Sequence, residues 1–132
     1  GAVAGVIYTR NTGNDLPGVE LRVDATNHFY FGTNANTWIQ STGVYNDNQL
    51  HIAMLRRQGR HLDIRVDGAP SGTPMDVDPI DASAVGVPGF VGGSESIEYL
   101  KGDIMSLLGF DATLDDAAVS KVETQLKAYY GL

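Results

Sequence analysis

The sequence contains no cysteine among its 132 residues, which excludes disulfide bonds, thiol nucleophiles and zinc sites built on thiolates. It has no apolar run near the roughly 18 residues that a membrane-spanning helix needs. Cations are scarce, with 9 Lys and Arg against 16 Asp and Glu, so the net charge is −7. Phosphate contacts need clustered cations, and anionic membranes repel an acidic chain. We therefore expect neither nucleic acid nor membrane insertion.

Length and composition suit one domain that spans residues 1–132. Hydrophobic residues make up 42% of the chain and charged residues 19%, which predicts a packed core rather than disorder. The 16 glycines, with frequent Asn and Asp between apolar stretches, are typical of many tight turns.

Short alternating segments predict an antiparallel β-structure. The clearest is residues 60–67, in which Leu62, Ile64 and Val66 share one face and polar residues share the other. The same reasoning predicts five further strands, at residues 6–9, 19–24, 28–32, 37–40 and 90–92.

Residues 50–57 are also strand-like, with Leu50, Ile52 and Met54 on one face. Because Gln58-Gly59 lies between this segment and the next strand, the sequence predicts an antiparallel hairpin that turns there.

The second half of the chain is less regular. Residues 69–88 hold four prolines, which predicts a loop with at most an edge strand. Residues 99–110 are nearly continuously apolar, a pattern typical of a strand buried on both faces.

The C-terminus predicts one helix over residues 114–130. Thr113 is the expected capping residue, with Asp116 three positions later, and Gly131 is the expected C-cap. An apolar stripe recurs at helical spacing, at Ala118, Val122, Leu126 and Tyr129. The sequence thus predicts an all-β fold, an antiparallel jelly-roll β-sandwich with one C-terminal α-helix.

Three segments resemble signatures of laminin-G-like and concanavalin A-like jelly-roll domains. The first is the hairpin Leu-His-Ile-Ala-Met-Leu-Arg-Arg-Gln-Gly at residues 50–59 with Leu-Asp-Ile-Arg-Val-Asp-Gly at residues 62–68. The second is Phe-Val-Gly-Gly at residues 90–93 with Tyr-Leu-Lys-Gly-Asp-Ile at residues 99–104, and the third is the closing helix. The resemblance implies the jelly-roll fold, and a recognition role that differs between members.

The family usually has one or two strands before the segment equivalent to residues 5–9, and these have no counterpart here. Missing strands would leave backbone groups unpaired at a sheet edge. We therefore expect a neighbouring chain, either a second copy or a strand donor, or an upstream segment to complete the sheet.

The pattern does not predict an enzyme. Glucanases of this fold carry a Glu-x-Asp-x-x-Glu string, which is absent, and Glu95 and Glu98 are the only close pair of glutamates. The three histidines lack the spacing of a metal site, and no Gly-x-Ser-x-Gly motif occurs.

The sequence contains one candidate site for a cofactor, a calcium ion. Asp76, Asp78 and Asp81 place three carboxylates in one loop, and calcium prefers such oxygen ligands. The alternative, which the spacing favours, is that these aspartates form turns around Pro79.

A glycan site is the candidate for ligand binding. Trp38 and Tyr45 could stack on sugar rings, while Asn34, Asn36 and Asp47 could bind hydroxyl groups. The alternative, which we favour, is that Trp38 is a core residue and the polar residues form turns.

These observations predict a non-catalytic recognition or adhesion module, which binds a glycan or a protein surface within a larger extracellular or surface assembly. The alternative is a structural domain of a virus or phage particle, whose open sheet edge a neighbouring chain completes. A divergent glycoside hydrolase is a third interpretation. The absence of cysteine and of N-glycosylation motifs favours a bacterial or phage source.

Overall fold

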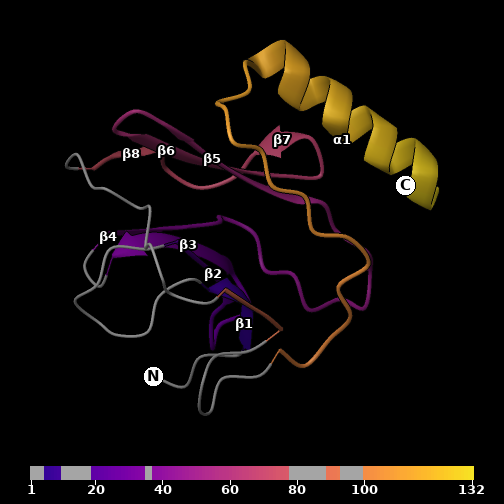
Figure 1. Ribbon diagram of the computed structural model, residues 1–132. Coiled ribbons are helices and arrows are strands. Elements are labelled where there is room, and N and C mark those ends of the chain that lie inside the picture. The colour runs from indigo at the N-terminus through magenta and orange to yellow at the C-terminus, as the bar shows by residue number, and fades with distance from the viewer. Residues whose placement is uncertain (1–4, 10–18, 35–36, 78–88, 93–99) are drawn as a thin grey trace.

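The computed structural model describes residues 5–9, 19–34, 37–77, 89–92 and 100–132. Two antiparallel sheets lie one above the other, and a C-terminal helix, α1 (Asp116–Tyr130), lies on the far side of the second sheet (Figure 1). This arrangement confirms an antiparallel β-fold with one C-terminal helix.

The first sheet, sheet A, has five strands in the order β4-β3-β2-β1-β9. Their bounds are β1 (Gly5–Thr9), β2 (Glu20–Val23), β3 (Phe29–Asn34), β4 (Thr37–Gln40) and β9 (Phe90–Val91). Sheet B has the order β5-β6-β7, with β8 also paired to β6. Its strands are β5 (Ala53–Gln58), β6 (His61–Val66), β7 (Ala69–Pro70) and β8 (Met75–Asp76).

The core lies between the two sheets. The alternation predicted for residues 60–67 is confirmed, because Leu62, Ile64 and Val66 are all buried in this core. Sheet A contributes the facing side chains, Phe29, Phe31 and Ile39, and Val77 follows β8 into the same cluster.

The first strand of the hairpin differs from the prediction by one residue in phase. Ala53 and Leu55, not Met54, pack against the core, because they pair across the ladder with the core residues Val66 and Ile64. Ile52, which is buried, precedes the ladder and bonds to Asp67 instead. Leu50 is exposed outside the strand. The ladder closes with Gln58 opposite His61, so the turn is Gly59-Arg60 rather than Gln58-Gly59.

The predicted helix is confirmed, but its cap is different. Asp115, not Thr113, is the N-cap, because its carboxylate accepts the Ala118 N–H at 2.8 Å. The Thr113 hydroxyl instead donates to the Arg57 carbonyl. Gly131 closes the helix in the left-handed conformation, as predicted.

The strand predicted at residues 99–110 is wrong over the described part of that range. Residues 100–113, which we call the strap, form no strand, and no described residue pairs with them in a ladder. Four of its apolar side chains are about half exposed: Met105 (61%), Leu107 (46%), Leu108 (55%) and Phe110 (53%). A strand buried on both faces needs a packed layer over each face, whereas these side chains are largely in water.

Candidate functional site: a groove around the edge of β5

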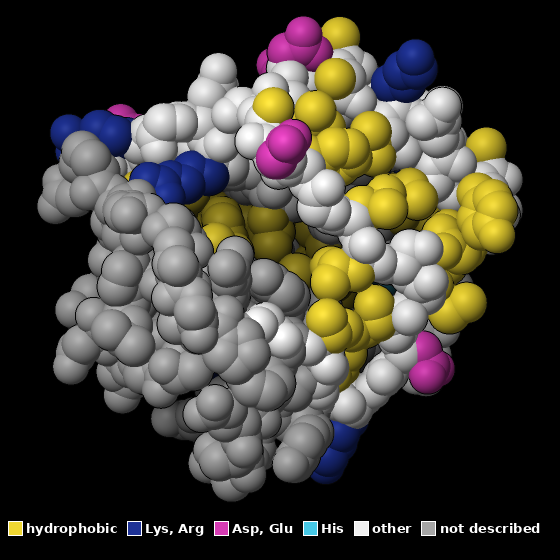
Figure 2. Space-filling model, viewed as in Figure 1, with side chains coloured by type: hydrophobic (Ala, Val, Ile, Leu, Met, Phe, Trp, Pro, Cys, Tyr) yellow, Lys and Arg dark blue, Asp and Glu magenta, His cyan; other side chains and the backbone are white. Residues whose placement is uncertain are grey.

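A hollow of about 1730 Å³ opens beside the hairpin, and we call it the groove. Hydrophobic side chains gather around it on the face shown in Figure 2. All residues from Leu50 to Arg57 line it, and so does every residue of the strap, whereas no residue of β6 does. The groove therefore surrounds the side of β5 that faces away from β6.

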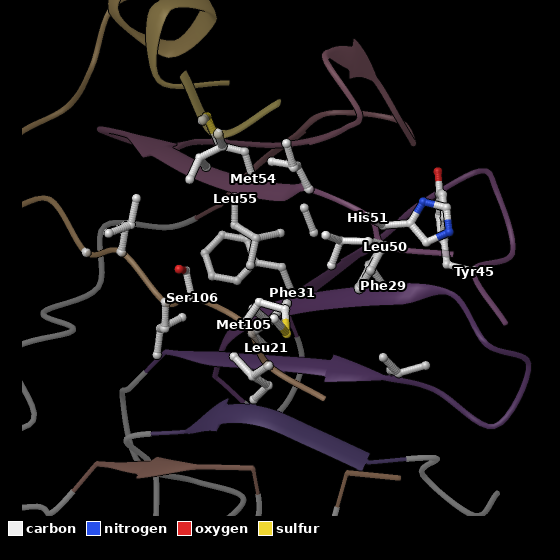
Figure 3. A pocket seen from close by; sticks show the side chains of 18 of the residues that line it. Leu21, Phe29, Phe31, Tyr45, Leu50, His51, Met54, Leu55, Met105 and Ser106 are labelled. Carbon is white, nitrogen blue, oxygen red and sulfur yellow. The ribbon is translucent and has the colours of Figure 1, made fainter. Parts of the chain in front are cut away.

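Two apolar walls enclose this edge. The inward face of sheet A forms one wall, with the side chains of Leu21, Val23, Phe29 and Phe31. The other wall is α1, with Val119, Val122, Leu126 and Tyr130. Figure 3 shows the β5 side chains Met54 and Leu55 together with Leu21 and Phe31 of sheet A and Met105 of the strap. Side chains from both faces of β5 therefore line the groove.

The strap crosses the groove and is held near both ends. At one end the Leu100 N–H donates to the Gly92 carbonyl, at 2.9 Å. At the other end Arg56 donates to the Leu114 carbonyl, at 3.2 Å, where the chain enters α1. In the middle, the hydroxyls of Ser106 and Tyr130 share a hydrogen bond.

Ion pairs fix the helical wall to the outer face of sheet B. Arg65 binds both carboxylate oxygens of Glu123, at 2.9 and 3.1 Å, and Glu123 is buried. Arg56 bridges Asp63 of β6, at 2.9 Å, and Asp116 of α1, at 2.6 Å. Arg65 alternates with the core residues of β6, and Arg56 follows Leu55, which packs against the core from β5, so both cations lie on the outer face of sheet B. The position of α1 over β5 is therefore set by charge as well as by packing.

His51 lies at the mouth of the groove between two carboxylates. Its Nδ1 lies 2.8 Å from Asp67 and its Nε2 lies 3.0 Å from Asp47, so the imidazolium form can donate to both. Partial burial lowers the pKa of His51, but the hydrogen bonds to Asp67 and Asp47 outweigh it, and the pKa is raised from its ordinary value. The ring of Tyr45 meets the His51 ring edge-on, at 4.9 Å between centroids.

The residues predicted for a glycan site are not brought together. Tyr45 packs on the core residue Phe29, with ring centroids 4.8 Å apart. Trp38 lies on the opposite face of sheet A, stacked on Tyr30 at 4.5 Å, and is not a member of the core cluster. Asp47 binds His51. Asn34 ends β3, and Asn36 lies outside the described residues.

Trp38 belongs to a packed cluster on the outer face of sheet A. The Arg22 guanidinium lies 5.7 Å from the centre of its ring, and the indole covers Gly32 so closely that a Cβ there would lie 2.1 Å from it. Gln40 and Asp24 are hydrogen-bonded on the same sheet. The cluster gives the indole a structural role that does not depend on a ligand.

The structure describes only one of the three aspartates predicted to bind calcium. Asp76 ends β8, and one of its carboxylate oxygens lies 3.0 Å from His61 Nδ1. Asp78 and Asp81 lie outside the described residues, as do Glu95 and Glu98. Within the described part of the chain, no three potential metal ligands gather at one point.

No protein family, no curated protein and no solved structure matches the chain. The described helix is also too short and too polar to cross a membrane. The groove and its walls are therefore the features from which a function is argued.

Proposed function

We propose that this domain is a non-catalytic recognition module, which binds another polypeptide in the groove as part of a larger extracellular or surface assembly. The groove carries the proposal. Its volume of about 1730 Å³ exceeds the roughly 300–1,000 Å³ of sites for small molecules, so a polymer segment fits it better. Exposed apolar side chains crowd around it, which is typical of a protein interaction site.

The second candidate is a structural domain of a virus or phage particle. The exposed strap favours it, because a permanent contact would keep Met105, Leu108 and Phe110 covered. The two candidates share one contact and differ in its lifetime. A dissociation measured in seconds would favour a recognition module, whereas a complex that survives gel filtration would favour a particle component.

A glycan ligand has less support, since the predicted aromatic residues point to opposite faces of sheet A. A glycan array compared with Trp38→Ala tests it directly. The predicted calcium site is tested by thermal melting with calcium and with chelator, because a bound ion raises the melting temperature.

The groove can be tested without a known partner. A displayed library of random peptides is selected on the wild-type domain, and the enriched peptides are then titrated against two variants. Met105→Glu places a charge at the groove, whereas Met75→Glu is the matched control on β8, away from the groove. Both methionines are exposed, so both variants should fold.

We expect peptides that bind the wild type and Met75→Glu equally and lose most of their affinity for Met105→Glu. If no peptide is enriched, or if Met105→Glu binds them as well as the control does, the groove is not the recognition site.

A further inference from the structure

We infer that the partner is a β-strand that is apolar on both faces and that pairs at Ala53 and Leu55 with the edge of β5 facing away from β6, which adds a strand to sheet B. This inference names the partner of the proposed function and rests on it. Three features of the groove carry it: the edge of β5, the two walls beside that edge, and the way the strap is tethered.

The edge of β5 lies inside the groove. Within the described residues, β6 is the only strand that pairs with β5. By the alternation of the ladder, Ala53 and Leu55 direct backbone N–H and C=O groups toward the groove, on the same edge as the Arg57 carbonyl that accepts from Thr113. Backbone groups of this kind are satisfied by an added strand, which gains affinity through main-chain hydrogen bonds.

The walls determine the side chains of such a strand. A strand that extends sheet B beyond β5 would turn one face toward sheet A, where Leu21 and Phe31 lie. It would turn its other face toward α1, where Val119 and Val122 lie. Successive side chains of a strand point to opposite faces, so residues of both parities would be buried in apolar surroundings. The sequence of the partner strand should therefore be a continuous run of apolar residues, not an alternation of apolar and polar residues.

The chain itself contains a run of this kind. Residues 103–110 read Asp-Ile-Met-Ser-Leu-Leu-Gly-Phe, yet they cross the groove as the strap and form no ladder. A second copy could offer the same run only after its strap left the contacts near Leu100 and Leu114. Two chains of net charge −7 would also repel each other. We therefore assign the groove to a strand of a different polypeptide.

Four synthetic peptides with the same flanking lysines test the inference by fluorescence anisotropy. The first carries the sequence of residues 103–110 as a model of a strand that is apolar on both faces. The second has serine in place of Met105 and Leu107, which leaves the apolar side chains of Ile104, Leu108 and Phe110 on one face only. The third is the first with N-methyl groups on alternate residues along one edge, and a fourth with the methyl groups on the other edge is its control.

We expect the first peptide to bind at least about tenfold more tightly than the second. We expect one of the two N-methylated peptides to lose binding and the other to keep it, because only one edge of the added strand faces β5. Met105→Glu should weaken the binding of the first peptide to the domain, whereas Met75→Glu should leave it unchanged. Hydrogen exchange should slow at the amides of β5 when the first peptide is bound.

Several results would overturn the inference and leave the proposed function standing. The one-faced peptide could bind as tightly as the two-faced peptide, or both N-methylated peptides could bind alike. A third such result is that none of these peptides binds, although the random library yields ligands of the groove. The domain could also be a dimer that Met105→Glu dissociates, which would make a second copy the occupant. Protection of both the strap and β5 in the isolated monomer would show that the strap itself completes the sheet.

Discussion

The hairpin of β5 and β6 and the strap are both rich in apolar residues, but only the hairpin is packed. Leu62 of the hairpin is fully buried, whereas Leu108 of the strap is 55% exposed. The hairpin has a ladder partner within its own sequence, a facing sheet and a helix held by ion pairs. Among the described residues the strap has no ladder partner. Apolar side chains thus favour burial in both regions, but they are buried only where a neighbouring element packs against them.

The largest loss of stability should follow from breaking the ion pair between the hairpin and α1. Glu123→Ala leaves the Arg65 guanidinium without its buried carboxylate and should cost about 3–5 kcal/mol in the free energy of unfolding. Urea denaturation measures this cost. The double variant Arg65→Met with Glu123→Leu, which removes both charges, should recover much of it. A loss below about 1 kcal/mol for Glu123→Ala would show that the helix is not held in this way.

Local patterns of the sequence predict what depends on near neighbours. Alternation placed Leu62, Ile64 and Val66 in the core, and the terminal glycine marked the end of α1. The pattern erred by one residue at β5, because bonds between Ile52 and Asp67 end the ladder at Ala53. No local signal in the sequence tells which of the two alternating sets of β5 side chains faces the core.

Contacts between distant parts of the sequence could not be predicted. Arg65 and Glu123 are 58 positions apart, and nothing near either residue marks the other as its partner. Sequence reasoning placed Trp38 and Tyr45 in one site, although the folded β3 separates them onto two faces. The groove was also missed as a site. Its one signal in the sequence is the apolar run of residues 99–110, whose pattern predicts a strand buried on both faces.

The comparison of the hairpin with the strap is tested most directly by two identical truncations. Leu62→Ala should cost about 2–5 kcal/mol, because it leaves a cavity between the sheets. Leu108→Ala removes the same atoms from a side chain that is mostly in water, and it should change the stability by less than about 0.5 kcal/mol. Equal losses in urea denaturation would mean that the strap is packed in solution, and the contrast between the two regions would fail.

The strap can also be compared with a packed position of sheet A, Gly32 in β3, by adding a methyl group to each. Gly32→Ala would place a Cβ 2.1 Å from the Trp38 ring, so the indole must move, at a cost of about 1–3 kcal/mol. Trp38 is the only tryptophan, so its fluorescence reports the movement. Gly109→Ala in the strap would meet no described heavy atom within 4 Å and should leave both stability and emission unchanged. An unchanged emission for Gly32→Ala would contradict the close packing of Trp38.

The smallest effect should come from the pH dependence of the His51 contacts, which hold the chain just before β5. The pKa of His51 is raised in the folded domain, so its contribution is fully present below the unfolded value of about 6.5. It is lost as the pH rises through the higher folded value, because the neutral ring can no longer donate to both Asp67 and Asp47. Both carboxylates are partly exposed, so solvent weakens the effect. Urea denaturation, measured at pH values between the unfolded and the folded pKa of His51, should show a small loss of stability toward higher pH. The variant His51→Gln should lack this pH dependence. The same pH dependence in His51→Gln would assign it to another group.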